Sequence, residues 1–326
     1  MSARDLAASG PKIPHLPLGD WVVHVVDWIN NNLGPLLDGI GSVISTCVSG
    51  LTDVLEFVPW PLMIVILAAL GWWLRTWKFA IFAVLGPLLI VSLGLWDVAM
   101  KTLGLIVVAA VIALVLAIPI GVAAAQSRVV SRIAKPVLDL MQTMPAFVYL
   151  IPVVILFSLG AVPGVLATVI FAMPPGVRLT ELGIRQVDPE VVEAGEAFGA
   201  APFKVLARIK LPLALGTIMA GVNQVIMLAL SMVVIAGMVG APGLGSSVTQ
   251  ALAQIEIGSG AEAGVAIVIL AIYLDRITEA LGARMSPVAT LERKMRRRNR
   301  RTTRNRSAAA ESGARTADAD KVGVDS

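Results

Sequence analysis

Apolar runs of about 20 residues recur along this chain, and short charged stretches separate them. A run of that length is what an α-helix needs to cross the hydrocarbon core of a bilayer, which is ~30 Å thick. The pattern therefore predicts an all-α, polytopic membrane protein with about seven transmembrane helices. The expected spans, given to within several residues, are 58–75, 79–96, 102–125, 136–159, 161–178, 213–240 and 262–283.

The region before these spans, residues 19–57, has a different pattern. Apolar residues such as Trp21, Val25 and Ile29 recur at three- and four-residue spacing, and acidic and amide residues lie between them. This periodicity predicts one or two amphipathic helices lying along the membrane surface. A soluble helical cap is the alternative interpretation. Residues 1–18 are polar, contain proline and glycine, and are expected to be disordered.

The basic residues indicate how the chain is oriented, because loops rich in Lys and Arg stay on the cytoplasmic side. All basic clusters lie on one side if the N-terminus is outside and the C-terminus is inside. The opposite loops carry few positive charges. The cytoplasmic clusters in this arrangement are Arg75 and Lys78; Arg128, Arg132 and Lys135; Arg178, Arg185, Lys204, Arg208 and Lys210; and the tail after span seven.

Composition changes this picture in two ways. Hydrophobic residues make up 57% of the chain and charged residues 15%, well below the roughly one quarter that is typical of soluble domains. The net charge of +4 comes from the tail 286–326, where residues 291–306 carry nine Arg or Lys against one Glu. We expect this tail to lie near anionic membrane lipid in the cytoplasm. A topology anchor alone explains it as well, and nothing indicates a nucleic-acid partner.

The residues that soluble enzymes use for catalysis are scarce here. The single cysteine, Cys47, excludes an internal disulfide and a cysteine-based metal cluster. The two histidines, His15 and His24, both lie in the N-terminal region, and the chain has neither H-E-x-x-H nor the G-x-x-x-x-G-K-[ST] of a P-loop. We therefore predict that the chain is not itself an enzyme, with no catalytic residue, metal or other cofactor.

One polar stretch, DPEVVEAGEAFGAAPFKVLARIKLP at residues 188–212, interrupts the apolar segments. Asp188 is a good N-cap, and Pro189 suits the first position of a helix. Gly199 stands where a left-handed residue ends a helix, so residues 189–198 are expected to be helical. Pro202 can begin a second helix that ends before Pro212 and the next span. The expected result is a rigid helix–turn–helix knob with small residues, suited to a groove on a cytosolic partner.

This stretch resembles the EAA loop of the permeases of ABC importers, whose pattern is E-A-A, three residues, G, nine residues and I-x-L-P. The matching residues are Glu193, Ala194, Gly195, Gly199, Ile209, Leu211 and Pro212. The single departure is Gly195 at the second alanine, a small-for-small change. In that family the loop docks into a cleft of the ATPase subunit, so the resemblance assigns these residues to coupling with a cytosolic ATPase.

Two further segments extend the resemblance. PVLDLMQTMPAFVYLIPVVILF at 136–157 and NQVIMLALSMVVIAGMVGAPGLG at 223–245 are similar to the permeases of glycine betaine/proline importers, and related permeases for choline or carnitine share them. The resemblance covers roughly residues 19–285. It implies a five-span permease core at 97–285, two additional spans at 58–96, and a position in the cytoplasmic membrane of a prokaryote. The implied partners are a separate ATPase, an extracytoplasmic solute-binding protein and a second copy of the chain.

Few polar groups lie within the expected spans. Asp139, Gln142, Asn223 and Gln224 are notable, because polar residues inside a membrane are often functional. Such amides also serve as hydrogen-bonding links between helices. Together with two aromatic residues that packing explains equally well, the candidates for a translocation path are Gln142, Phe147, Tyr149, Asn223 and Gln224. An ion-coupled secondary transporter and a non-transporting membrane assembly protein are the alternative functions.

Overall fold

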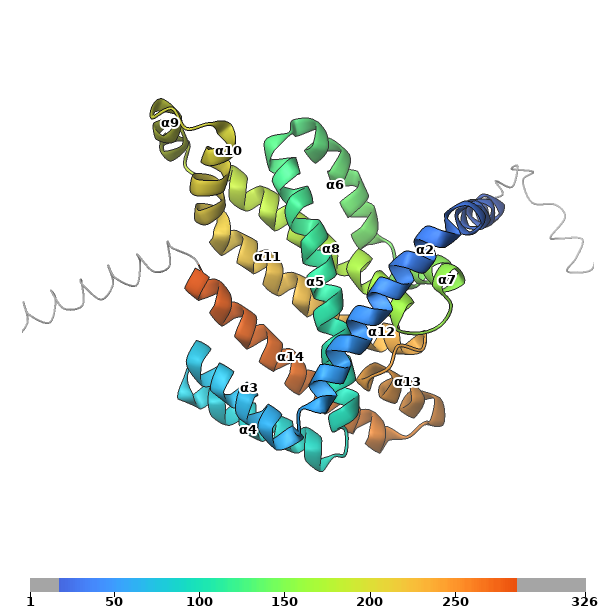
Figure 1. The fold of residues 1–326 in the computed structure, drawn as a ribbon. Coiled ribbons are helices and arrows are strands. Elements are labelled where there is room, and N and C mark those ends of the chain that lie inside the picture. Colours follow the sequence, from blue (N-terminus) through green and yellow to red (C-terminus); the bar gives the residue numbers. More distant parts are fainter. Residues whose placement is uncertain (1–17, 286–326) are drawn as a thin grey trace, which may run out of the picture.

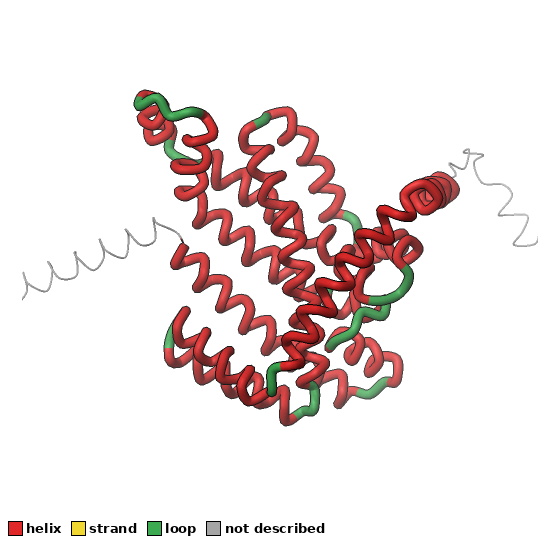
Figure 2. The backbone as a smooth tube through the Cα atoms, in the orientation of Figure 1, coloured by secondary structure: helices red, strands yellow, loops and turns green. Residues whose placement is uncertain are grey.

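The computed structural model describes residues 18–285, and every regular element in that range is a helix (Figure 2). The predicted all-α, polytopic fold is therefore confirmed. The predictions for the polar N-terminus and the basic tail lie outside the described residues, apart from Leu18. In chain order the elements are α2 (Leu18–Phe57), α3 (Trp60–Leu74), α4 (Trp77–Ser92), α5 (Trp96–Gln126), α6 (Arg128–Thr143), α7 (Ala146–Phe157), α8 (Ala161–Arg185), α9 (Pro189–Ala197), α10 (Pro202–Val205), the π-helical turn η1 (Leu206–Lys210), α11 (Leu211–Ser231), α12 (Val233–Met238), α13 (Leu244–Gln254) and α14 (Ile257–Met285).

Helices α5, α8 and α11 form the centre of the molecule and approach one another closely (Figure 1). Gly121 on α5 faces Thr180 on α8, and a Cβ at Gly121 would lie 2.6 Å from the Thr180 Cβ. Gly183 on α8 faces α11 in the same way, at 2.9 Å from Thr217. Small residues allow this contact, which is how helices associate in a membrane, where burial of apolar surface gives little driving force.

The described helices include five that are long and apolar enough to cross a membrane. These are α2, α5, α8, the continuous helical stretch at 202–238, and α14. The expected spans at 58–75 and 79–96 correspond to α3 and α4, which have 15 and 16 residues. At 1.5 Å per residue each is only about 22–24 Å long, less than the hydrocarbon core. The count of seven spans stays a prediction.

The expected span at 136–159 is not one straight helix, and its crossing of the membrane stays a prediction. The structure has two helices there, α6 and α7, which meet at an angle of 95°. The break lies at Met144, whose backbone is extended, with φ −73° and ψ 133°. Proline disfavours the helical conformation of the residue before it, so Pro145 ends α6 and begins the turn into α7.

The second helix of the polar stretch begins at Pro202 as predicted, but the prediction that it ends before Pro212 is wrong. Helical backbone continues from α10 through η1 into α11 without a break. Pro212 lacks the N–H that an α-helix would use at that position. The π-turn directly before it, in which the Leu211 N–H donates to the Leu206 carbonyl, is the local adjustment. The base of the polar stretch is therefore rigidly joined to a membrane helix.

Residues 18–57 form the single helix α2 rather than two helices. Its length and composition also qualify it as a candidate span. In Figure 1, however, α2 runs across α5 and crosswise to α11 and α14. This placement is compatible with the predicted position along the membrane surface, which stays a prediction.

Candidate functional site

The EAA hairpin, residues 188–212, projects from one end of the helical bundle (Figure 1). Its first helix, α9, begins as predicted. Asp188 is the N-cap, and its carboxylate accepts a hydrogen bond from the Glu190 N–H at 3.0 Å. Pro189 occupies the first turn, where its missing N–H has no cost. Side-chain capping therefore sets where this helix starts.

The turn that follows α9 is closed by two backbone hydrogen bonds. Gly199 has φ +77°, in the left-handed region, as predicted. Its N–H donates to the Glu196 carbonyl at 2.8 Å, and the Ala200 N–H donates to the Gly195 carbonyl at 3.2 Å. This pair of bonds is the Schellman motif, which satisfies the last carbonyls of a helix and fixes the exit direction of the chain.

The two arms of the hairpin touch at Gly195. A Cβ at this position would lie 2.4 Å from Cδ1 of Ile209, so the glycine gives room to that side chain. In the sequence pattern Gly195 only replaces the second alanine of the EAA motif. The structure adds that it is the contact point between α9 and η1.

A buried apolar cluster anchors the base of the hairpin to the membrane helices. Leu206 belongs to this cluster together with Ile184 at the end of α8 and Ala214 and Ile218 on α11. Leu211 and residues from the end of α5 pack around them. Because three membrane helices meet here, the base of the hairpin and the bundle form one rigid unit.

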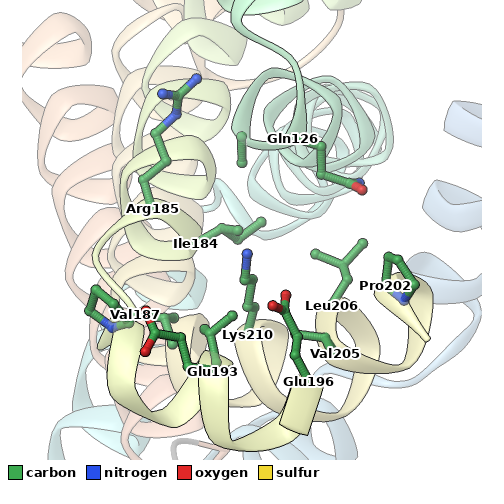
Figure 3. Close-up of a pocket in the computed structure, with 13 residues that line it drawn as sticks. Gln126, Ile184, Arg185, Val187, Glu193, Glu196, Pro202, Val205, Leu206 and Lys210 are labelled. Carbon is green, nitrogen blue, oxygen red and sulfur yellow. The ribbon is translucent and has the colours of Figure 1, made fainter. Parts of the chain in front are cut away.

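A cavity of about 590 Å³ separates the body of the hairpin from the ends of α5 and α8 (Figure 3). Glu193, Glu196 and Lys210 extend toward it from the hairpin, and Arg185 lies on the α8 side. The full lining is Ala125, Gln126, Ile184, Arg185, Val187, Pro189, Val192, Glu193, Glu196, Pro202, Val205, Leu206 and Lys210. Glu193, the first residue of the EAA pattern, therefore faces the interior of the hairpin as well as solvent.

The tip of the hairpin is apolar and exposed. Phe198 is 92% exposed and Phe203 is 76% exposed, on either side of the glycine turn. Both lie on a polar segment that is expected in the cytoplasm, where large exposed aromatic side chains mark interaction surfaces. Leu206, three residues after Phe203, is by contrast buried in the base cluster.

A polar network lies directly beneath the hairpin and was not anticipated from the sequence. The buried carboxylate of Glu181 accepts a hydrogen bond from the Ser131 hydroxyl at 2.7 Å, and Nε of Arg185 lies 2.9 Å from the same oxygen. Nη2 of Arg185 donates to the Ala124 carbonyl at 2.8 Å. These contacts join α5, α6 and α8. Arg185 was expected in a loop, but α8 continues beyond residue 178 to include it.

The candidates for the translocation path are not brought together. Gln142 is exposed on α6, and Phe147 is half-exposed on α7. Tyr149 is buried in a cluster with Ala167 and Met232, and among the described residues its hydroxyl has no hydrogen-bond partner. The structure therefore gives Tyr149 a packing position.

Asn223 links α11 to α14. Its Nδ2 donates to Oδ1 of Asp275 at 2.9 Å, and its Oδ1 accepts from the Thr278 hydroxyl at 2.7 Å. This agrees with the interpretation of Asn223 as a link between helices. Gln224, next in the chain, is exposed. Asp275 is an acidic residue inside the expected span 262–283, a signal in the sequence that could have identified this link.

An ion pair between α6 and α8 was also missed. Nη2 of Arg178 donates to Oδ1 of Asp139 at 2.5 Å, and the side chains are 42% and 65% exposed. Asp139 was noted in the sequence as a polar residue, but Arg178 was assigned to a loop. No local pattern could have paired residues 39 positions apart. Within the described chain, no group of three acidic, His or Cys residues could hold a metal ion.

Comparison with known proteins identifies relatives over most of the chain. The family described as "Binding-protein-dependent transport system inner membrane component" matches residues 117–287. Glycine betaine transport system permease protein OpuAB of Bacillus subtilis is 52% identical over 268 residues, which cover 82% of this chain and 95% of OpuAB. Glycine betaine/carnitine transport permease protein GbuB of Listeria monocytogenes is 48% identical over 279 residues, covering 83% and 97%.

Two further comparisons agree. Glycine betaine/proline betaine transport system permease protein ProW of Escherichia coli is 43% identical over 267 residues, covering 82% of this chain and 75% of ProW. Among solved structures, a chain of the MetNI methionine ABC transporter in an inward-facing conformation matches with a TM-score of 0.51 and 21% identity, covering 56% of this chain and 92% of that one. At that identity the match shows the shared fold alone.

Proposed function

Because this chain belongs to the family of binding-protein-dependent transport system inner membrane components, we propose that it is the membrane-spanning permease of an ATP-driven importer for compatible solutes of the glycine betaine type. Three relatives at 43–52% identity carry glycine betaine in their names, and two of these are covered almost completely. The chain is thus a protein of the cytoplasmic membrane, and it supplies the path for the solute.

The EAA hairpin supports the proposed contact with a separate ATPase. It is capped at Asp188, closed by the Schellman turn at Gly199 and continuous with α11 through its second arm. This rigidity carries the proposal: a partner that moves the hairpin tip also moves the base cluster on α5, α8 and α11. The exposed Phe198 and Phe203 provide an apolar contact at the tip.

The proposed mechanism is alternating access. ATP binding closes the ATPase subunits, the hairpins move with them, and the bundle opens outward to receive solute from an extracytoplasmic binding protein. Hydrolysis returns the permease to the inward-facing state. The chain carries one EAA hairpin, and two ATPase subunits need two, so we infer that a second copy completes the transporter. Rigid-body motion of packed helices is a common way to transmit such a change.

Reconstitution tests the proposal. The permease is purified with its ATPase and solute-binding protein and placed in liposomes, and uptake of labelled glycine betaine is measured. Uptake is expected to require ATP on the ATPase side and the binding protein on the other side. A matched control uses an ATPase that is unable to hydrolyse ATP. Collapse of the proton and sodium gradients by ionophores is expected to leave uptake unchanged.

Two results would contradict this function. Uptake that follows an ion gradient without ATP would make the chain a secondary transporter. Absence of both uptake and stable association with the ATPase would favour an assembly protein.

A further inference from the structure

Helix α6 carries a continuous polar stripe on an exposed face beside α8. The residues of the stripe recur at spacings of four, three, four and three, which places them on one face of the helix. All of them are exposed in the structure, whereas Ser131 and Leu138 on the neighbouring face are buried. The stripe consists of Arg128, Arg132, Lys135, Asp139 and Gln142.

The stripe lies on the first helix of a bent pair, α6–α7, that together is apolar and long enough to be a broken membrane span. Helix α6 starts directly after α5, beside the cavity beneath the EAA hairpin, and ends at the bend into α7. At 1.5 Å per residue, Asp139 lies about 16 Å along α6 from Arg128. Arg178 lies about 10 Å along α8 from Arg185, measured from the same end of the bundle. Asp139 and Arg178 therefore lie short of the ends of their helices, and both belong to candidate membrane-spanning segments: the bent pair α6–α7 and the helix α8.

A charged side chain in a membrane-spanning segment rarely faces lipid, because its transfer into hydrocarbon is unfavourable in free energy. Such side chains line a water-filled cavity or another protein surface instead. Both partners are partly exposed in the single chain, which leaves them accessible from the space beside α6 and α8. In the described part of the chain the main contacts of α6 are with α5 and α8. The polar stripe is consequently the best candidate for a wall of the solute path.

We propose that the Asp139–Arg178 pair is a solute subsite that exchanges its internal ion pair for the two charges of a zwitterion. This rests on the proposed function. Glycine betaine carries a carboxylate and a quaternary ammonium, so its carboxylate binds the Arg178 guanidinium while its ammonium lies against the Asp139 carboxylate. The exchange leaves no charge unpaired, because Asp139, Arg178 and both charged groups of the solute each keep a partner of opposite sign.

The chemistry of the rest of the path favours this assignment. Residues 97–326 contain no Trp, so a tryptophan cage for the ammonium group cannot be built there. Asn223, another polar group in an expected span, is engaged with Asp275 and Thr278. A site that must compete with its own ion pair also binds weakly, which lets the solute leave for the cytoplasm.

A variant in which both Asp139 and Arg178 are replaced by neutral amides distinguishes a solute subsite from a purely structural ion pair. If the pair only joins α6 to α8, then Asp139→Asn with Arg178→Gln keeps a hydrogen-bonding pair without an uncompensated charge and restores transport. If the pair binds solute, the same variant folds but offers no charge to either end of the zwitterion. The double variant is therefore the decisive one, and single variants are secondary.

The experiment uses the complete transporter in liposomes and receptor-free permease in nanodiscs. For the double variant we expect at least a tenfold loss of glycine betaine uptake per ATP hydrolysed, with thermal stability unchanged. Saturation-transfer NMR between solute methyl groups and receptor-free permease is expected to weaken at least fivefold. The matched control is Arg75→Gln with Glu279→Gln, which neutralises an exposed pair 2.6 Å apart that joins α14 to the α3–α4 turn. It is expected to behave as wild type.

Uptake and NMR contact at wild-type level in the double variant would overturn the proposal. Equal losses in the double variant and the control pair would overturn it too, because the effect would then belong to any exposed ion pair. Failure of the wild-type transporter to move solute at all would instead contradict the proposed function.

Discussion

Gly199 and Gly195 stand four residues apart in the EAA hairpin, and each is needed for a different physical reason. Gly199 has φ +77°, and nothing lies within 4 Å of where its Cβ would be, so only the backbone conformation restricts it. Gly195 has an ordinary helical backbone, but Ile209 occupies the space of its Cβ. Space is the constraint at Gly195, and the end of a flexible side chain can move to relieve it.

The effect of replacing Gly199 is therefore expected to depend on how readily the new residue adopts a left-handed backbone conformation, and not on the size of its side chain. Gly199→Val strains the Schellman turn by roughly 1–2 kcal/mol and misaligns the two arms. We expect this variant to reach the membrane and bind its ATPase, with ATP hydrolysis uncoupled from uptake. Gly199→Asn, which adopts positive φ more readily, is the control and is expected to transport. Normal uptake by Gly199→Val would argue against a rigid coupling hairpin.

At the scale of elements, the Glu181 network ties α6 and α5 to the end of α8 just below the hairpin. The carboxylate is buried, with both contacts supplied by groups near the ends of these helices that adjoin the EAA hairpin. Removal of one member leaves the remaining polar groups with fewer partners in a region of low water content. The network thus joins the end of α8 next to the EAA hairpin to α5 and α6.

Glu181→Ala is expected to lower the free energy of unfolding by about 1–2 kcal/mol. A fully buried pair would cost more, but the Arg185 side chain is 40% exposed, which lets water compensate part of the loss. Ser131→Ala is expected to cost about 1 kcal/mol, the value of one hydrogen bond. Thermal unfolding in nanodiscs measures both. Glu190→Ala, at an exposed position on α9, is the control, and an equal loss there would refute the assignment.

At the scale of the whole molecule, the orientation of α2 relative to the membrane decides the topology. It has the length and composition of a span, and yet it runs crosswise to α11 and α14 in Figure 1. Charge patterning predicts that the N-terminus is outside, and α2 then stays on the outer surface if α3 and α4 both cross. The two arrangements place the start of α2 on opposite sides of the membrane.

Labelling with a membrane-impermeant maleimide in intact cells distinguishes these arrangements. In a Cys47→Ser background, Asp20→Cys is expected to be labelled from outside. Gly258→Cys, at the start of α14, should behave in the same way. Ala200→Cys in the EAA hairpin should react only after permeabilisation. Labelling of Asp20→Cys only in permeabilised cells would make α2 a membrane span, and labelling of Ala200→Cys in intact cells would reverse the orientation.

Features that depend on a short stretch of chain were predictable from the sequence. Apolar runs of membrane length determine an all-helical membrane protein because a bilayer offers no other partner for backbone polar groups. The N-cap at Asp188 and the left-handed Gly199 follow from backbone conformation within a few residues. The spacing from Glu193 to Pro212 likewise carries the family resemblance, since it reflects one local hairpin.

The tertiary structure alone decided how distant residues pair and where helices continue. Asp139 meets Arg178 across 39 positions, Ser131 meets Glu181 across 50, and Asn223 meets Asp275 across 52. The prolines show the same limit: Pro145 breaks a helix, whereas Pro212 is accommodated by a π-turn inside one. Both prolines lack a backbone N–H and have the same restricted φ. Packing against neighbouring helices therefore determines whether the broken or the continuous helix has the lower free energy.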